Sequence, residues 1–270
     1  MAAHVTSTGF DADGVRLITP ADVEFDALIE TLAASGWAQT LREAAPSIVI
    51  VANETNQKIV ALSTMFTVVG GPHEGTNSVF YVAPDAIAAN ELDYGRASSL
   101  GILPGRQEMI GFDFAVPDRR YYSGFTRDES DFYDPQVRNW IQTTARELAS
   151  AHTVHVTLEA VIFDDGGLLG DPANHLAAHF DALVQARQGT FRSVLGSLEA
   201  GDRVDDVMTR LWPADEPADS DRLTTEWHAM NEARNTVATL LEKYGGDALP
   251  GALRRALLPQ SFAIHGRTQA

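Results

Sequence analysis

The sequence contains no cysteine and only two lysines among its 270 residues. The absence of cysteine excludes disulfide bonds, thiol catalysis and cysteine-ligated zinc within the chain. The chain also lacks any run of about 18 apolar residues, so the sequence predicts no membrane insertion. Its N-terminus does not show the basic and then apolar pattern of a signal peptide. We therefore expect a soluble protein, either cytoplasmic or exported with its signal removed.

Basic side chains are in the minority throughout the chain. The sequence has 37 acidic and 20 basic residues, a formal net charge of −17, and the first 170 residues hold 23 of the acids and 10 of the bases. Proteins that bind the phosphate backbone need clustered lysine and arginine to release counterions. The charge therefore argues against nucleic acid as a partner.

Common enzyme signatures are missing as well. The sequence has no G-x-G-x-x-G, no G-x-x-x-x-G-K-[ST], no G-x-S-x-G and no H-E-x-x-H. These motifs mark dinucleotide sites, P-loops, hydrolase elbows and zinc proteases. Their absence favours a noncatalytic binding or structural protein.

The first 46 residues are predicted to form a helical segment. Thr19 and Pro20 are suited to a helix cap and a first helical position, and apolar residues recur at helical spacing up to Pro46. From Ser47 the period changes to two, which is typical of strands. Residues 48–51 and 59–69, separated by polar turn residues, predict a hairpin.

Further strands are expected at residues 79–83, 109–116 and 154–163. Strands that follow one another without intervening helices favour an antiparallel sandwich over a parallel sheet. We therefore predict a β-sandwich domain over residues 47–170. In the last of these strands His155, Thr157 and Glu159 alternate with apolar residues, so the sequence places them on an outer, polar face.

After Gly170 the pattern becomes helical to the end of the chain, residues 171–270. Helices are expected at about 172–198, 204–211, 223–244 and 248–258. Amphipathic helices need a surface to pack on, which the same chain, a second copy or a protein partner can supply. The predicted fold class is α+β, an antiparallel sandwich followed by a helical C-terminal region.

An insertion at residues 118–150 interrupts the predicted sandwich and ends in a helix from Pro135 to Ala149. Long insertions of this kind are often functional. Aromatic rings and guanidinium groups gather in it, as they do in ligand sites, although the same rings would also suit a cover over the sheet edge. The candidate ligand-binding residues are Arg119, Arg120, Tyr121, Tyr122, Tyr133 and Trp140.

His175 and His179 lie one helical turn apart, a spacing at which two imidazoles can bind one metal ion. Asp171 precedes them and is the third candidate ligand. The glutamate of the zinc-protease motif is absent, so an ordinary surface pair explains the spacing equally well. A metal-dependent hydrolase built on this pair is one alternative function, and a carbohydrate or peptide binder built on the insertion is another.

Two further motifs have simple structural interpretations. Asn53-Glu54-Thr55 matches a glycosylation sequon but also suits a polar turn. Asp164-Asp165-Gly166 follows an apolar strand, as in haloacid-dehalogenase-type phosphatases. That chemistry needs a second carboxylate where Gly166 stands, so a hairpin turn is the better interpretation.

The order of these motifs resembles uncharacterised bacterial immunoglobulin-like modules. The features that carry the resemblance are the strand and turn at Ile48–Thr55, the Leu103-Pro104-Gly105 corner, and the strand 155–163 leading into a long helix. The resemblance covers residues 47–195 and implies an immunoglobulin-like β-sandwich. It carries over no catalytic residue and no cofactor, and it leaves the ligand open.

Overall fold

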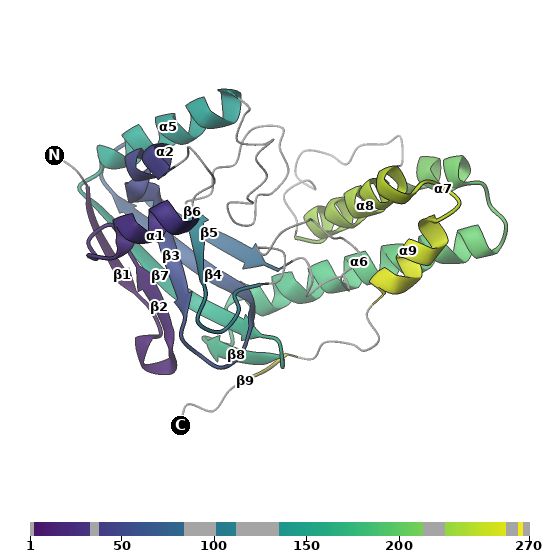
Figure 1. The fold of residues 1–270 in the computed structure, drawn as a ribbon, viewed down its shortest axis with the longest axis horizontal. Helices are drawn as coiled ribbons and strands as arrows, with labels where there is room; N and C mark the ends of the chain where they lie inside the picture. The colour runs from purple at the N-terminus through teal and green to yellow at the C-terminus, as the bar shows by residue number, and fades with distance from the viewer. Residues whose placement is uncertain are drawn as a thin grey trace. The chain divides into compact units, whose positions relative to one another are not determined.

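The structure, a computed structural model, describes residues 3–32, 38–83, 101–111, 135–212, 225–257 and 264–266. The chain divides into two compact units (Figure 1). The first contains Met1–Val82, Leu100–Asn174 and Ile264–Ala270, and the second contains Ala83–Ser99 and His175–Ala263. Helices and mainly antiparallel sheets are both present, so the predicted α+β class is confirmed.

The larger sheet of the first unit has six strands. Its order is β5 (Gly75–Val82), β4 (Ile59–Val69), β7 (Thr153–Phe163), β8 (Gly167–Gly170) and β9 (His265–Gly266), with β1 (His4–Thr8) also paired to β7. β4 pairs with the whole length of β7 on one side. On the other side β1 runs parallel to Thr153–Thr157, and β8 runs antiparallel to Ala160–Ile162. The two central strands, β4 and β7, therefore hold the sheet together.

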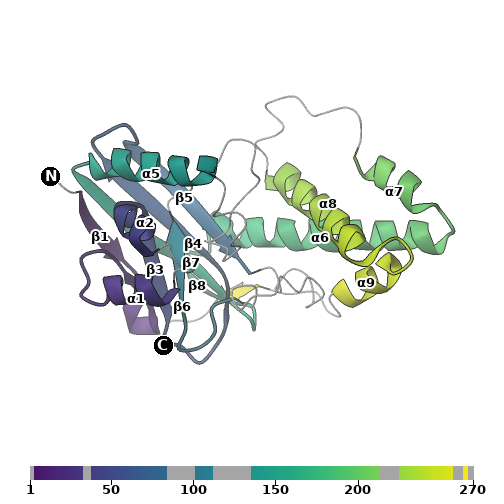
Figure 2. The same cartoon turned by 45° about the horizontal axis from the view of Figure 1, so that its top comes forward.

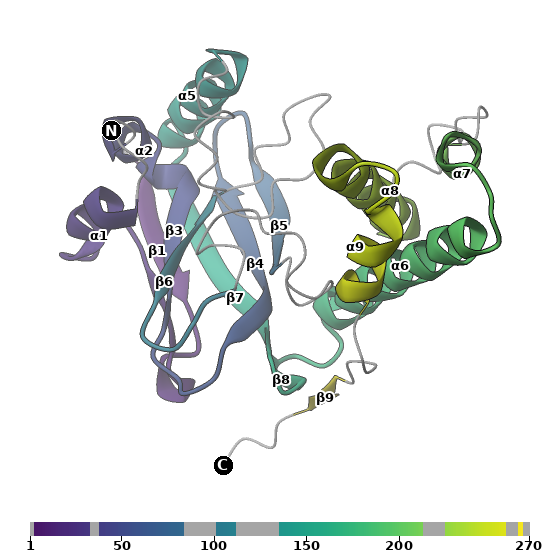
Figure 3. The same cartoon turned by 45° about the vertical axis from the view of Figure 1, so that its right-hand side comes forward.

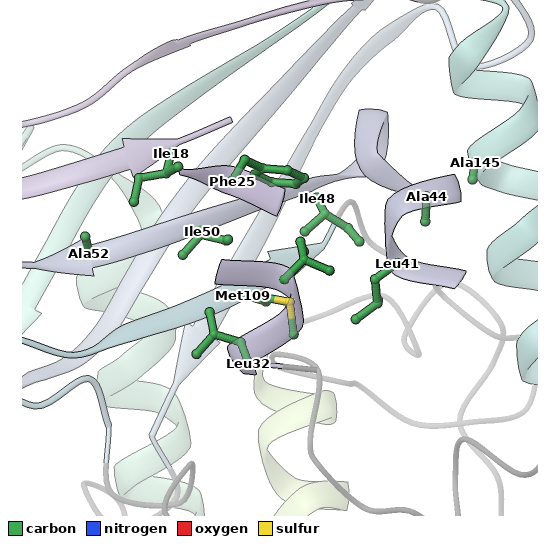
Figure 4. Packing of buried hydrophobic residues seen from close by; sticks show 11 residues of the cluster. Ile18, Phe25, Leu32, Leu41, Ala44, Ile48, Ile50, Ala52, Met109 and Ala145 are labelled. Atoms are coloured by element: carbon green, nitrogen blue, oxygen red, sulfur yellow. The ribbon is translucent and has the colours of Figure 1, made fainter. Parts of the chain in front are cut away.

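The smaller sheet has the order β2 (Val15–Ile18), β3 (Ile48–Asn53) and β6 (Gln107–Gly111). Every residue of β3 is buried, which explains its unbroken apolar sequence. Helices α1 (Phe25–Leu32), α2 (Ala38–Glu43) and α5 (Pro135–Ala149) contribute to an apolar cluster on one face of this sheet (Figure 4). The views in Figures 1 and 3 show the smaller sheet lying over the larger one.

The N-terminal segment contains two strands that the sequence analysis did not predict, together with the short 3-10 helices η1 (Asp11–Asp13) and η2 (Ala45–Ser47). Arg16 in β2 donates hydrogen bonds to Glu24 at 2.7 Å and to Glu54 at 3.4 Å. The hydrogen bond from Arg16 lowers the pKa of Glu24. The arginine thereby joins β2 to the chain that precedes α1 and to the turn that follows β3.

The predicted hairpin between residues 48–51 and 59–69 is wrong. β3 pairs with β2 and β6, whereas β4 pairs with β5 and β7, so the two strands belong to different sheets. The polar residues between them form a crossing from one sheet to the other. A hairpin turn and a crossing of this kind use the same residue types, so the local sequence does not distinguish them.

Asn53 organises this crossing. Its Nδ2 donates to the carbonyl oxygens of Gln57 at 2.8 Å and Ile102 at 2.7 Å, and its Oδ1 accepts from the backbone and hydroxyl of Thr55. Its backbone bonds to Gly105 and Arg106 in the segment that leads into β6. Asn53 is 1% exposed, so the polar-turn interpretation is confirmed and its amide is inaccessible in the folded chain.

The second unit consists of helices. These are α6 (His175–Glu199), α7 (Val204–Leu211), α8 (Thr225–Tyr244) and α9 (Leu249–Ala256). Phe191, Val237, Leu240 and Leu253 are fully buried in a shared apolar cluster, and Figure 2 shows α8 alongside α6. Among the described residues no helix is both long and apolar enough to cross a membrane.

Replacing Asn53 with alanine tests its role in the crossing. The carbonyl oxygens of Gln57 and Ile102 would each lose one of their two donors, and the backbone N–H of Thr55 would lose its acceptor. Because several hydrogen bonds are lost together, we expect a loss of about 3 kcal/mol in the free energy of unfolding. Urea denaturation followed by circular dichroism measures it. Asn53→Asp keeps the size and the acceptor but loses the donors, so it should be comparably destabilising at neutral pH. Little destabilisation in either variant would contradict the role given to Asn53.

Candidate functional site

One face of the larger sheet is rich in polar side chains. Strand register places alternate residues of β1, β7, β4 and β5 on this face, which we term the hydroxyl face. Its polar members are His4, Thr6, Thr8, Ser63, Thr67, Thr76, Ser78, Thr153, His155, Thr157 and Glu159, and Met65, Val69 and Phe80 lie on the same face. The intervening residues of β7, Val154, Val156 and Leu158, are buried. The alternation predicted for His155, Thr157 and Glu159 is therefore confirmed.

His155 lies at the centre of the β1–β7 part of this face. Its Nδ1 is 2.8 Å from Thr6 Oγ1, and its Nε2 is 3.3 Å from Thr8 Oγ1. Each hydroxyl can donate or accept a hydrogen bond, so the threonines match either tautomer of the ring. The imidazole thus ties the parallel strand β1 to β7.

Glu159 is the second focus of the hydroxyl face. A register shift between Ser63 and Thr64 makes Glu159 the extra residue of a β-bulge in β7. Its Oε2 accepts hydrogen bonds from Ser63 Oγ at 2.9 Å and Asn174 Nδ2 at 3.3 Å. Bulges change the direction of a side chain, and here the bulge brings the carboxylate against Ser63.

Gly170 at the end of β8 packs directly against the bulge. Its φ is +108°, and a Cβ placed on it would lie 2.3 Å from the carbonyl oxygen of Glu159 and 2.9 Å from Ala160 Cα. Neither contact can be relieved by moving a flexible side chain, because both atoms belong to the backbone. Only glycine therefore fits at this point, and the position of Glu159 depends on it.

Ser63, His155 and Glu159 are not arranged as a serine triad. Ser63 and Glu159 are hydrogen-bonded, but Ser63 is 0% exposed. His155, the natural general base, has both ring nitrogens next to the hydroxyls of Thr6 and Thr8. A serine triad needs the histidine between the serine and the acid, and this geometry does not provide that order.

Most residues of the predicted aromatic site lie outside the described part of the chain. These are Arg119, Arg120, Tyr121, Tyr122 and Tyr133. Trp140 belongs to α5, which spans Pro135–Ala149 as predicted, but its side chain is likewise outside the described residues. The ligand site in the insertion therefore stays a prediction.

The predicted metal ligands occupy two different elements. His175 and His179 lie in the first turns of α6, while Asp171 precedes that helix and its Oδ1 accepts a hydrogen bond from the backbone of Ala173. Within the described ranges no group of three or more histidine, aspartate or glutamate side chains is placed to hold a metal ion. The metal site stays a prediction that rests on sequence spacing.

The aspartates after β7 form a turn, as expected. β7 and β8 pair as an antiparallel hairpin, and Gly166 has a φ of +87° at its tip. Asp165 accepts hydrogen bonds from the backbone of Gly167 at 2.8 Å and from Gln57 Nε2 at 2.5 Å. Its carboxylate therefore fixes the turn and joins it to the crossing near Asn53.

Sequence reasoning identified the polar alternation in β7 but missed the partners that complete the face. Thr6 and Thr8 lie in a strand that the sequence analysis did not predict, and Asn174 lies in the segment before α6. The β-branched residues Val5, Thr6 and Thr8 were the only local signal for β1. Comparisons with protein-family models, curated proteins and solved structures found no match to this chain.

Gly170→Ala tests the packing beneath the bulge. We expect a loss of about 3 kcal/mol or more in the free energy of unfolding, because backbone strain and overpacking act together. Gly105→Ala is the matched control: its φ is +70°, but nothing lies within 4 Å of the added Cβ. That control should lose only about 1 kcal/mol. Similar losses in the two variants would contradict the close approach at Gly170.

His155→Val tests the tie between β1 and β7. Valine retains a high strand propensity but removes both hydrogen bonds to the threonines. We expect amide hydrogen exchange of Thr6 and Thr8 to become about five- to tenfold faster, with smaller changes in β4. Thr157→Val, on the same strand and face, is the control. Unchanged exchange in β1 would show that His155 does not hold this strand.

Proposed function

We propose that the chain is a noncatalytic binding or structural protein whose first unit is a scaffold for the hydroxyl face. In this proposal the two sheets form an immunoglobulin-like sandwich, as in the bacterial modules that the sequence resembles. The helices of the second unit serve packing or assembly, with a protein partner or a second copy. The hydroxyl face is the contact surface.

The observation that carries the proposal is that His155 and Glu159 are both hydrogen-bonded to neighbouring side chains on this face. His155 holds β1 through Thr6 and Thr8, and Glu159 accepts hydrogen bonds from Ser63 and Asn174. Side chains that are fixed by hydrogen bonds across strands lose little further entropy on binding. Such preorganisation favours recognition, whereas a general base must be able to reach the substrate proton.

Native mass spectrometry of the purified protein, without added metal or chelator, separates this proposal from the metal-dependent alternative. We expect the mass of the chain or of a simple multimer without stoichiometric metal, and the same result for His175→Ala. The hydrolase alternative requires bound metal in the wild-type protein, and loss of that metal in His175→Ala. That pair of results would overturn the proposal in favour of the hydrolase.

A further inference from the structure

The contact between α6 and α8 includes a hydrogen bond to sulfur. Thr190 in α6 is 6% exposed, and its hydroxyl donates to Met230 Sδ in α8 at 3.5 Å. A thioether is a weak acceptor, so a buried hydroxyl that points at sulfur makes a weaker hydrogen bond than one that points at an oxygen atom. The Thr190 hydroxyl is therefore placed to make a stronger bond wherever the sulfur carries a better acceptor.

Met230 is open to solvent as well. The chain has no cysteine, so its five methionines carry all of its sulfur. Met230 is 38% exposed, whereas Met109 is 5% exposed in the apolar cluster of the smaller sheet, and Met65 and Met208 are half-buried. Oxidation of sulfur in proteins follows its exposure. Of these four methionines, Met230 is the one that a dissolved oxidant reaches most readily.

The distance between the hydroxyl and the sulfur suits an oxidised methionine. Methionine sulfoxide carries an oxygen atom on the sulfur, and this oxygen is a polar acceptor. An O–H···O hydrogen bond is about 2.7 Å long. With the sulfur 3.5 Å from Thr190 Oγ1, a sulfoxide oxygen directed to the side of the hydroxyl reaches that length in a bent S–O···O arrangement. The contact between the two helices therefore accommodates the sulfoxide without a shift of either backbone.

From these contacts we propose that Met230 is a reversible oxidation site whose sulfoxide is held by Thr190. The oxidant is hydrogen peroxide. The sulfur lone pair forms a bond to one peroxide oxygen, the O–O bond breaks, and the other oxygen leaves as water, so that sulfur loses two electrons and the peroxide gains them. Methionine sulfoxide reductases restore the thioether, one enzyme for each epimer of the sulfoxide. The proposal goes beyond the proposed function and does not involve the hydroxyl face.

Peroxide treatment of the full chain, followed by peptide mass mapping, tests the site. We expect Met230 to gain one oxygen about tenfold faster than Met109, because exposure controls the rate. Treatment with the reductases for both epimers should then remove that oxygen. Oxidation of Met230 no faster than that of Met109, or retention of the oxygen after both reductases, would overturn the proposal. This measurement needs no variant.

Thr190→Val tests the group that holds the sulfoxide, because valine keeps the shape of threonine but removes the hydroxyl. Urea denaturation of the reduced and the oxidised protein gives the change in the folding equilibrium constant that oxidation causes. We expect oxidation to lower this constant about fivefold more in Thr190→Val than in the wild type, which is the effect of one hydrogen bond. Thr190→Ser retains the hydroxyl and should respond as the wild type does.

Two further variants are controls. Met230→Leu reports the effect of oxidising the other methionines, and this effect is divided out of each ratio. Thr239→Val removes an exposed hydroxyl of α8 that donates to the carbonyl oxygen of Asn235, and it should respond to peroxide as the wild type does. An equal response of Thr190→Val and the wild type would overturn the role of Thr190. Circular dichroism before treatment checks that each variant is folded.

Discussion

The first unit depends on one buried amide. The chain passes between the two sheets after β3 and again before β6, and both passages meet at Asn53. A buried amide with two donors and an acceptor can satisfy several backbone groups at once, which an apolar side chain cannot do. Without it, the carbonyl oxygens of Gln57 and Ile102 would each lose one of their two donors, and Thr55 would lose the acceptor of its backbone N–H. The stacking of the sheets therefore depends on a polar residue within an otherwise apolar strand.

A β-bulge in β7 connects the fold to the hydroxyl face. The register of β4 against β7 is regular from Thr64 to Val69, and the bulge at Glu159 changes it where β8 takes the place of β1 beside β7. Gly170 makes room for this change, since its hydrogen lies where any larger group would meet the Glu159 carbonyl. A local irregularity of the backbone thus determines the direction of the Glu159 carboxylate. β1 and β8 pair with successive parts of the same edge of β7, and the candidate site lies where one replaces the other.

The sequence predictions were right where the interactions are local in the chain and wrong where they join residues that are far apart in it. α5 and α7 have the bounds that capping and helical periodicity predict, because those signals act within a few residues. The pairing of β3 with β2 and β6 depends on residues far apart in the chain, and the predicted hairpin with β4 was wrong. β1 was missed because Val5 is its only buried residue, which leaves no apolar alternation to detect. The outer face of β7 could be predicted because the alternation lies within its own sequence. Its partners Thr6, Thr8 and Asn174 could not be predicted, because they come from distant parts of the chain.

The composition of the hydroxyl face is more specific than solubility requires. Charged side chains are the usual means of keeping an outer sheet face in water, and the chain uses them freely elsewhere, with 37 acidic residues. On this face the strands present mainly threonine and serine, with two histidines, Glu159 and the apolar side chains of Met65, Val69 and Phe80. Threonine has a high strand propensity, so its presence in the strands alone needs no further explanation. Strand propensity does not explain why His155 and Glu159 are both held by neighbouring polar groups; partly buried polar side chains need hydrogen-bond partners, and these contacts fix the geometry of the face.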